Sequence, residues 1–325
     1  MQRDFRFDIA RAVCMCYIIA ALHLSQYLGL QYYIYETYIG KLITFSCLGL
    51  FTFMSGYLIG GRYGFTMSGG NATKCILQFY KKRFVRIYPL FFIATILLYV
   101  IGFNKLKASI YGLLGIAPFV VQQPKTLWYV SMLMIFYLIT PLVNRKSIWW
   151  RVLMSTGFIL LFGLLKLFIY VDARFIFNLF FYCLGLVMSG IKIGYFNKTD
   201  YSNIWLHIVI IVAFVAALLL TNRWFSNTIS FFSVSAFGVM ALFSLSNLLS
   251  NIHNKALFKI VEFVSYASMV CYMFHRFFYW AGLELCSPAE TIWKILYLEI
   301  VFIIGLVVSY FIQRGYDRLF VKKTK

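Results

Sequence analysis

Charged residues are scarce in this chain, and acidic ones are scarcer still. Only 12% of its 325 residues are Asp, Glu, Lys or Arg, against about 25% in an ordinary soluble domain. Ten acids stand against thirty Lys and Arg. So few charges cannot cover a water-exposed surface, which excludes a soluble globular enzyme and a disordered chain. The basic residues form short clusters between apolar runs, a pattern typical of membrane orientation and lipid-headgroup contact rather than nucleic-acid binding.

Cysteine and proline are used in ways that exclude further classes. The seven cysteines form no C-x-x-C pair and lie mostly in apolar runs. A disulfide framework or zinc site is therefore not expected, and buried small apolar side chains are the better interpretation. His207 and His253 lack neighbours at ligand spacing, so we expect no bound metal. Five prolines and no apparent internal repeat argue against the interrupted, repeated spans of many transporters.

Apolar residues dominate what remains. Hydrophobic residues make up 62% of the chain, aromatic residues 20%, and the mean hydropathy is +0.82. At roughly 20 residues per crossing, this predicts an all-α integral membrane protein with about ten transmembrane helices. We expect one domain over residues 1–325, with short loops and no appended soluble domain. The predicted spans are about 8–28, 40–60, 87–103, 126–143, 149–170, 174–193, 203–221, 228–248, 260–281 and 291–313.

The distribution of Lys and Arg predicts the orientation. Most of the thirty basic residues lie in the two termini and in the alternate loops on the same side. By the positive-inside rule that side is cytoplasmic, so both termini are expected in the cytoplasm. The opposite loops, 29–39, 104–125, 171–173, 222–227 and 282–290, are then the outer ones.

The first predicted span contains ionisable residues that a bilayer disfavours. Asp8, Arg11 and His23 stand in an otherwise apolar run. Because such residues are costly unless paired or in a wet cavity, each is a functional candidate. Arg11 and His23 are separated by roughly 18 Å of helical rise and about 120° around the axis, so both can face one cavity if the helix is distorted. The alternatives are a histidine hydrogen-bonded to a neighbouring helix and a snorkelling arginine.

Arg83 and Arg86 form the second group, at the expected start of the third span. Their i, i+3 spacing places them on one helix face just before Pro89. Paired guanidinium groups match phosphate oxygens, so a phosphate clamp is one interpretation. A topology-setting charge cluster is the other, and it is the one we accept for Lys81 and Lys82.

The third group lies near the end of the chain. His275 and Arg276 fall inside the ninth predicted span, where a buried pair is expensive. An interfacial pair close to the outer leaflet, within an aromatic belt, is the alternative. Glu299 in the tenth span is a lone acid with no partner apparent from the sequence.

Six segments in order resemble the acyltransferase-3 family of membrane acyltransferases, over nearly the whole chain. The family's members transfer acyl groups, most often acetyl from acetyl-CoA, to sugars of surface or secreted polysaccharides. The segments are Asp8-x-x-Arg11 with the later His23, Phe51–Ile59, Lys82–Pro89, Leu127–Ser131 with Tyr137–Leu142, and Val264–His275.

Two departures from the family pattern are visible. The family usually has ten residues between the arginine and the histidine of the first helix, whereas eleven separate Arg11 from His23. The extra residue turns the histidine by about 100° unless a local bulge compensates. Leu133 and Met134 replace paired glutamates found in many members, which resembles the subgroup typified by enterobacterial common antigen O-acetyltransferase.

The resemblance implies a site and its substrates. His23 would be the general base, since an imidazole suits proton transfer near neutral pH. Arg11, Arg83 and Arg86 would hold the phosphates of cytoplasmic acetyl-CoA at a basic entrance. The acceptor glycan would enter from the outer side, where Trp128, His275 and four tyrosines are candidates, although an interfacial belt explains any single tyrosine as well. These tyrosines are Tyr32, Tyr33, Tyr35 and Tyr38.

The resemblance further implies a multi-pass protein of the bacterial inner membrane, with acyl-CoA, a polysaccharide or glycolipid acceptor and lipids as its partners. A second copy of the chain or other polysaccharide-synthesis proteins are compatible with it. Two alternatives stay open on the sequence: a glycan or lipid-linked sugar flippase without chemistry, and a structural subunit of a synthesis complex.

Overall fold

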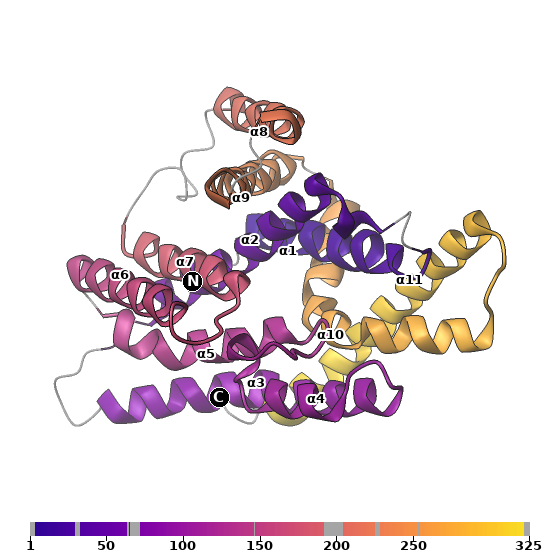
Figure 1. Ribbon diagram of the computed structural model, residues 1–325, viewed down its shortest axis with the longest axis horizontal. Helices are drawn as coiled ribbons and strands as arrows, with labels where there is room; N and C mark the ends of the chain where they lie inside the picture. Colours follow the sequence, from indigo (N-terminus) through magenta and orange to yellow (C-terminus); the bar gives the residue numbers. More distant parts are fainter. Residues whose placement is uncertain are drawn as a thin grey trace. The chain divides into compact units, whose positions relative to one another are not determined.

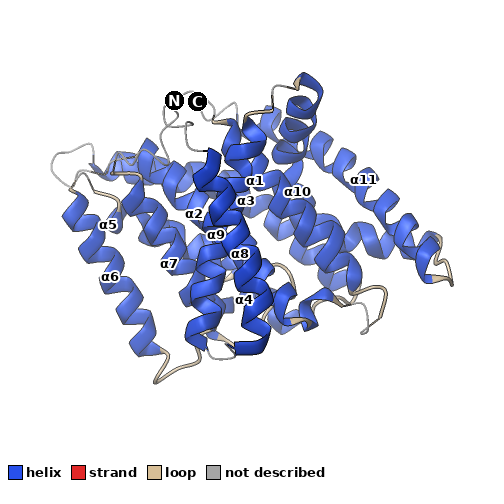
Figure 2. Cartoon of the chain, turned by 90° about the horizontal axis from the view of Figure 1, so that it is seen from above, coloured by secondary structure: helices blue, strands red, loops and turns tan. Residues whose placement is uncertain are grey.

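The computed structural model of the chain describes residues 4–29, 33–63, 65, 72–145, 147–191, 204–224, 228–252 and 254–321. The acceptor-side candidate Tyr32 and the isolated His253 lie outside these residues. The all-α prediction is confirmed: 84% of the structure is helix, with no strand in the described ranges (Figure 2). The elements are α1 (Phe5–Cys16), η1 (Tyr17–His23), η3 (Ile34–Glu36), α2 (Tyr38–Arg62), α3 (Ala72–Val100), α4 (Leu106–Leu113), η4 (Ala117–Phe119), α5 (Trp128–Val143), α6 (Ile148–Leu165), α7 (Ala173–Met188), α8 (Ile204–Trp224), α9 (Thr228–Ser250), α10 (Lys255–Leu285), α11 (Thr291–Tyr316) and η6 (Asp317–Val321).

Each of the ten predicted spans coincides with helix. Within the part of the chain that the structure describes, six helices are long and apolar enough to cross a bilayer, and three more apolar helices are shorter. The number of crossings and the side of the termini stay predictions. The six long helices are Tyr38–Arg62, Ala72–Val100, Ile148–Leu165, Ser230–Ser250, Lys255–Leu285 and Thr291–Phe320.

Two expectations about the region before α5 are wrong. Residues 104–125, expected to be an outer loop, are not simply a loop, because they contain α4 and η4. Gly115 ends α4 with φ +76°, and the N–H groups of Gly115 and Ile116 donate to the carbonyls of Gly112 and Tyr111 at 3.0 and 3.1 Å. This is a Schellman cap, for which glycine has the right conformational freedom.

The position of Pro89 is the second correction. It was expected at a span end but lies inside α3, which begins at Ala72. Proline removes one backbone donor from a helix, and membrane helices tolerate it because neighbouring groups satisfy the freed carbonyl. The basic cluster before Pro89 is therefore helical, and Arg83 and Arg86 do share a helix face.

The chain divides into two compact units. The first comprises residues 1–51 and 193–310, and the second residues 52–192 and 311–325. In the first, α1 packs against α9 and α10, while α8 lies along α9 (Figures 1 and 2). The contact on α8 follows helical spacing: over residues 204–220, whose side chains are described, the buried residues are His207, Ile210, Phe214 and Leu218.

In the second unit, α5 packs against α3, α6 and α7, and α6 lies beside α7 (Figures 1 and 2). The C-terminal half of α2 crosses α7 at two glycines. A Cβ atom on Gly56 would lie 2.1 Å from the carbonyl oxygen of Tyr182, and one on Gly185 would lie 2.3 Å from that of Phe53. Only glycine permits so close an approach of two backbones, as is common in membrane helix packing.

The cysteines follow the expected pattern in part. All seven are free thiols, and Cys14, Cys47, Cys183 and Cys271 are buried. Cys16 is half-buried, and Cys75 and Cys286 are exposed.

Candidate active site

The first helix widens before it reaches His23. α1 ends at Cys16 and continues as the π-helix η1 over Tyr17–His23. A π-helical turn takes up more residues than an α-helical turn. The structure therefore contains the kind of bulge that can absorb the extra residue between Arg11 and His23.

Side chains of α10 contact the carbonyl groups of this widened segment. The hydroxyl of Tyr279 donates to the carbonyl of Ile19 at 3.1 Å, and Nη1 of Arg276 lies 3.5 Å from the carbonyl oxygen of His23. Both α10 residues are buried, at 1% and 3% exposure. The π-helix is thus held from the neighbouring helix of the same unit.

His23 and His275 meet across these two helices. Nδ1 of His23 lies 2.7 Å from Nε2 of His275, and Nδ1 of His275 lies 2.8 Å from the carbonyl oxygen of Tyr272. The two rings are inclined by only 3°, with centroids 4.7 Å apart. Since the centroids are farther apart than the bonded nitrogens, the rings meet edge to edge, as an in-plane hydrogen bond requires. His23 therefore faces α10 of its own unit.

Arg11 lies on α1 and is held by a carboxylate and a hydroxyl. Its Nη1 lies 3.5 Å from Oδ1 of Asp8 and donates to Oγ of Ser265 at 3.2 Å. Ser265 in turn donates to Asp8 at 2.7 Å. Asp8 is buried at 6% exposure, whereas Arg11 is half-buried. Arg11 is thus a fixed, paired cation and not a freely snorkelling one, and its contact with coenzyme A stays a prediction.

Tyr35 lies on η3, beyond the first helix. Its ring centroid is 6.0 Å from that of Tyr33, and Nζ of Lys41 lies 5.9 Å from the Tyr35 ring. Tyr33 also accepts a hydrogen bond from Gln26. This aromatic group belongs to the first unit, together with the two histidines.

Arg83 and Arg86 lie on α3 in the second unit. The guanidinium of Arg83 lies 5.3 Å from the ring of Tyr137 and 5.7 Å from that of Phe79, so cation–π contacts restrain it. Arg86 is exposed and interacts electrostatically with Arg83, Arg62 and Asp317. Arg62 is the last residue of α2. Three arginines with one acid form a positive group suited to a polyanion.

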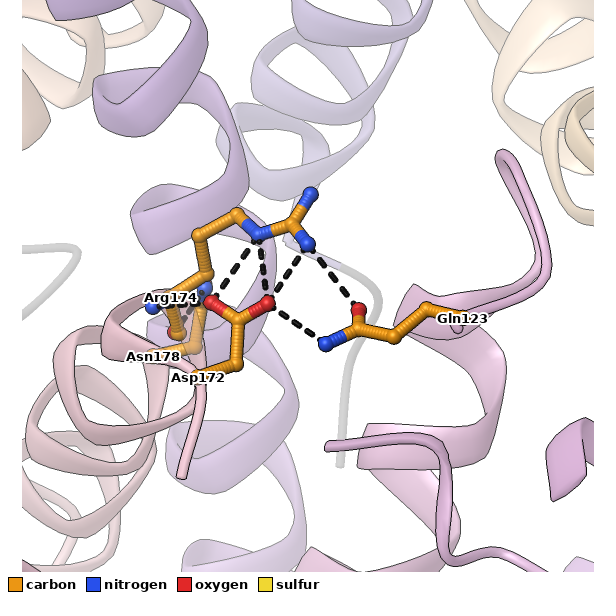
Figure 3. A network of polar contacts seen from close by, with 4 residues as sticks. All are labelled: Gln123, Asp172, Arg174 and Asn178. Atoms are coloured by element: carbon orange, nitrogen blue, oxygen red, sulfur yellow. Dashed lines mark hydrogen bonds and ion pairs between the residues drawn. The ribbon is translucent and has the colours of Figure 1, made fainter. Parts of the chain in front are cut away.

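Trp128 begins α5, and a polar network fixes the cation above its ring. The guanidinium carbon of Arg174 lies 4.2 Å from the indole centroid. Arg174 donates to Asp172 at 2.5–3.0 Å and to Gln123 at 2.9 Å, and Gln123 donates to Asp172 at 2.7 Å (Figure 3). Asn178 donates to the carbonyl of Arg174 at 2.7 Å. The network ties the segment before α5 to the start of α7.

A family profile described as an acyltransferase domain matches residues 4–314, nearly the entire chain. The chain belongs to the acyltransferase-3 family. Comparison with curated proteins and with solved structures gave no match. Membership of this family and the apolar helices together indicate that this acyltransferase is a multi-pass membrane protein. The subgroup suggested by Leu133 and Met134 stays a prediction.

Some candidate residues of the acyltransferase lie close to one another in the structure. His23 and His275 form a hydrogen-bonded pair, and Arg83 and Arg86 share one face of α3. Arg11, Tyr35 and the histidines belong to the first unit, while Trp128, Arg83 and Arg86 belong to the second. Their meeting in one cavity is therefore still a prediction. Within the described ranges, no group of three His, Cys, Asp or Glu residues is arranged to hold a metal ion.

Asp172 caps α7 and has a lowered pKa. Burial favours the neutral acid, but the hydrogen bonds and charge of Arg174, together with the amide of Gln123, outweigh burial and hold the pKa of Asp172 below its ordinary value. The backbone N–H of Arg174 also donates to Asp172 at 2.8 Å. The ionised carboxylate is thus the form that stabilises this part of the acyltransferase.

Asp172→Asn is expected to destabilise the protein at neutral pH. Asparagine keeps one acceptor oxygen, so the net loss is about that of one charged hydrogen bond, 1.5–3 kcal/mol, which lowers the unfolding midpoint by roughly 2–6 °C. Because the folded-state pKa is lowered, this contribution is complete above the ordinary pKa of about 3.9 and disappears as the pH falls through the lowered value. Thermal unfolding in detergent across a pH series measures the difference.

The exposed Glu290, replaced by glutamine, provides the matched control. Its midpoint should follow that of the wild type throughout the series. An Asp172→Asn midpoint equal to that of the wild type at neutral pH would contradict the stabilising role of the network.

Proposed function

We propose that this protein is an O-acyltransferase that moves an acyl group, acetyl in the first instance, from cytoplasmic acyl-CoA to a hydroxyl of a surface or secreted polysaccharide or its lipid-linked precursor. The proposal places it in a bacterial inner membrane. Family membership supports acyl transfer in general. The observation that carries the finer proposal is the contact of His23 with His275, 2.7 Å apart, inside an apolar helical unit.

His23 is the proposed general base. The acceptor hydroxyl loses its proton to His23 as its oxygen attacks the thioester carbonyl, forming a C–O bond. The C–S bond then breaks, and the proton passes from His23 to the departing thiolate. The products are the O-acyl ester and coenzyme A with a free thiol, so the imidazole returns to its starting state.

The donor is proposed to bind through its phosphates. Arg83 and Arg86 on α3, with Arg62 near them, offer guanidinium groups to a polyanion. Arg11, already paired with Asp8, is the cation on the same helix as the base. The twelve-residue separation of Arg11 and His23 along α1 and η1 suits an extended pantetheine arm.

The acceptor is proposed to lie against aromatic rings. Trp128 has the guanidinium of Arg174 at 4.2 Å from its indole centroid, which orders the indole for stacking on a sugar face. Tyr35 is the corresponding candidate in the first unit. The sequence makes His275 an acceptor-side candidate, whereas its contact with His23 favours a place beside the base.

The purified protein in proteoliposomes, supplied with radiolabelled acetyl-CoA, tests this function. The acceptors are polysaccharide and lipid-linked glycan fractions of the source organism, treated with mild alkali to expose their hydroxyls. We expect label in an alkali-labile ester and an equal amount of coenzyme A thiol. Sugar transport across the vesicle membrane without thiol release would favour the flippase alternative and reject the enzyme.

A further inference from the structure

We infer that His275 is a positioning residue that fixes the tautomer of His23. A chain of hydrogen bonds runs from the Tyr272 carbonyl through His275 to His23, with distances of 2.8 and 2.7 Å. Its kinetic consequence rests on the proposed function, while the direction of its hydrogen bonds does not.

The direction of the chain is set at the Tyr272 carbonyl. A carbonyl oxygen only accepts hydrogen bonds, so Nδ1 of His275, 2.8 Å away, must carry the proton. With the proton on Nε2 instead, two acceptors would face each other in a buried place, which is costly. His275 is 2% exposed.

The neutral form of His275 follows from its surroundings. The imidazole is buried, and the next residue along α10 is the buried Arg276, at 3% exposure. A second positive charge beside this guanidinium would be repelled and poorly solvated. His275 with its proton on Nδ1 therefore presents a lone pair at Nε2.

The last link determines the state of His23. Because Nε2 of His275 accepts, Nδ1 of His23 must donate, and its proton is held there. Nε2 of His23 then carries the lone pair that a general base needs. In many catalytic histidines, a carboxylate or carbonyl that accepts a hydrogen bond from one ring nitrogen fixes the tautomer. Here a second histidine lies between the carbonyl and the proposed base.

The helices explain why these groups stay aligned. His275 bonds to a carbonyl three residues earlier on α10, so its ring is tied to its own helix. Across the contact, Tyr279 donates to Ile19 in the π-helix at 3.1 Å. The same two helices are thus joined at more than one point, which limits rotation of His23 away from its partner.

Two replacements of His275 separate position from bulk. In His275→Gln, the amide oxygen reaches about where Nε2 was and still accepts from His23. In His275→Asn, the shorter side chain places its polar atoms near the position of Nδ1 and leaves His23 without an acceptor. We expect kcat for acetyl transfer to fall roughly 10²-fold or more in the asparagine variant. The glutamine variant should recover most of the rate, with acetyl-CoA affinity unchanged in both.

The tautomers are read directly by nitrogen NMR of the full-length protein in lipid, with labelled histidine. The chain has four histidines, so single variants assign the signals. We expect both His23 and His275 to be neutral with the proton on Nδ1, and His23 to lose this fixed state in His275→Asn but keep it in His275→Gln. A proton on Nε2 of His23 in the wild type would overturn the inference even if the protein is an acyltransferase. The expected tautomers in a protein without transferase activity would reject the proposed function and leave the relay intact.

Discussion

Replacing His23 by glutamine is expected to lower kcat for acyl transfer by roughly 10²–10⁴-fold, with acetyl-CoA binding unchanged. Glutamine fills a similar space and places its amide near the position of Nε2, where the lone pair of the proposed base was. Its amide cannot take a proton at neutral pH, so proton transfer is removed together with the hydrogen bond from Nδ1 to His275. Single-turnover rates give the effect on chemistry, and equilibrium dialysis with labelled acetyl-CoA gives the affinity.

His207 supplies the matched control for this variant. It lies on α8 of the same unit, is 7% exposed, and its Nδ1 lies 3.3 Å from Oγ of Ser244. His207→Gln therefore changes a buried histidine of comparable environment away from the proposed base, and should keep the wild-type rate. Equal rates for His23→Gln and the wild type would reject His23 as the base. Equal losses in both variants would attribute the effect to folding.

Hydropathy predicted the helices well because the bilayer imposes their length. The run predicted as 203–221 is the helix Ile204–Trp224, and 291–313 is Thr291–Tyr316. Lipid cannot satisfy backbone polar groups, so a long apolar run must be helical. The same reasoning fails at the helix ends. α3 begins at Ala72 and includes a strongly basic stretch before Pro89. Hydropathy detects only the apolar second half of this helix, so it does not predict that the basic first half is helical.

Two local features of the sequence indicate structure that hydropathy alone does not predict. Gly115 marks the end of α4, and its positive φ is what the cap requires. The eleven residues between Arg11 and His23 pointed to a distortion. The contacts that η1 makes with α10, such as the hydrogen bond from Tyr279 to Ile19, come from residues far along the chain, and no local pattern reports them.

For a similar reason, the sequence does not identify the partner of His23. His23 and His275 are 252 positions apart, and their contact depends on how α1 and α10 pack. Asp172 and Arg174 bond to Gln123, about fifty residues earlier, through packing of the same kind. Spacing along one helix identifies residues on a shared face, but it does not identify what lies opposite that face.

The donor site gives the second large expected effect. Arg83→Lys keeps the positive charge beside Tyr137 but loses the planar guanidinium fork. Hydrogen bonds to charged groups are worth about 1.5–3 kcal/mol, so the Kd for acetyl-CoA should rise roughly 10- to 100-fold. KM should rise with it while kcat changes little, since phosphate binding is the same in the ground and transition states.

Acetyl-pantetheine, which keeps the thioester but lacks the nucleotide and its phosphates, separates phosphate binding from other effects. If Arg83 binds phosphate, the wild type and Arg83→Lys should use this shortened donor equally well. Lys82→Ala, an exposed change next to it on α3, should behave as wild type with both donors. A similar loss with acetyl-pantetheine would instead mean that Arg83 acts through its cation–π contacts with Tyr137 and Phe79. Equal losses of acetyl-CoA use in Arg83→Lys and Lys82→Ala would mean that the basic cluster attracts the donor only through nonspecific positive charge. Because the phosphates are the only anionic groups of the donor, the difference between the two donors isolates the guanidinium fork.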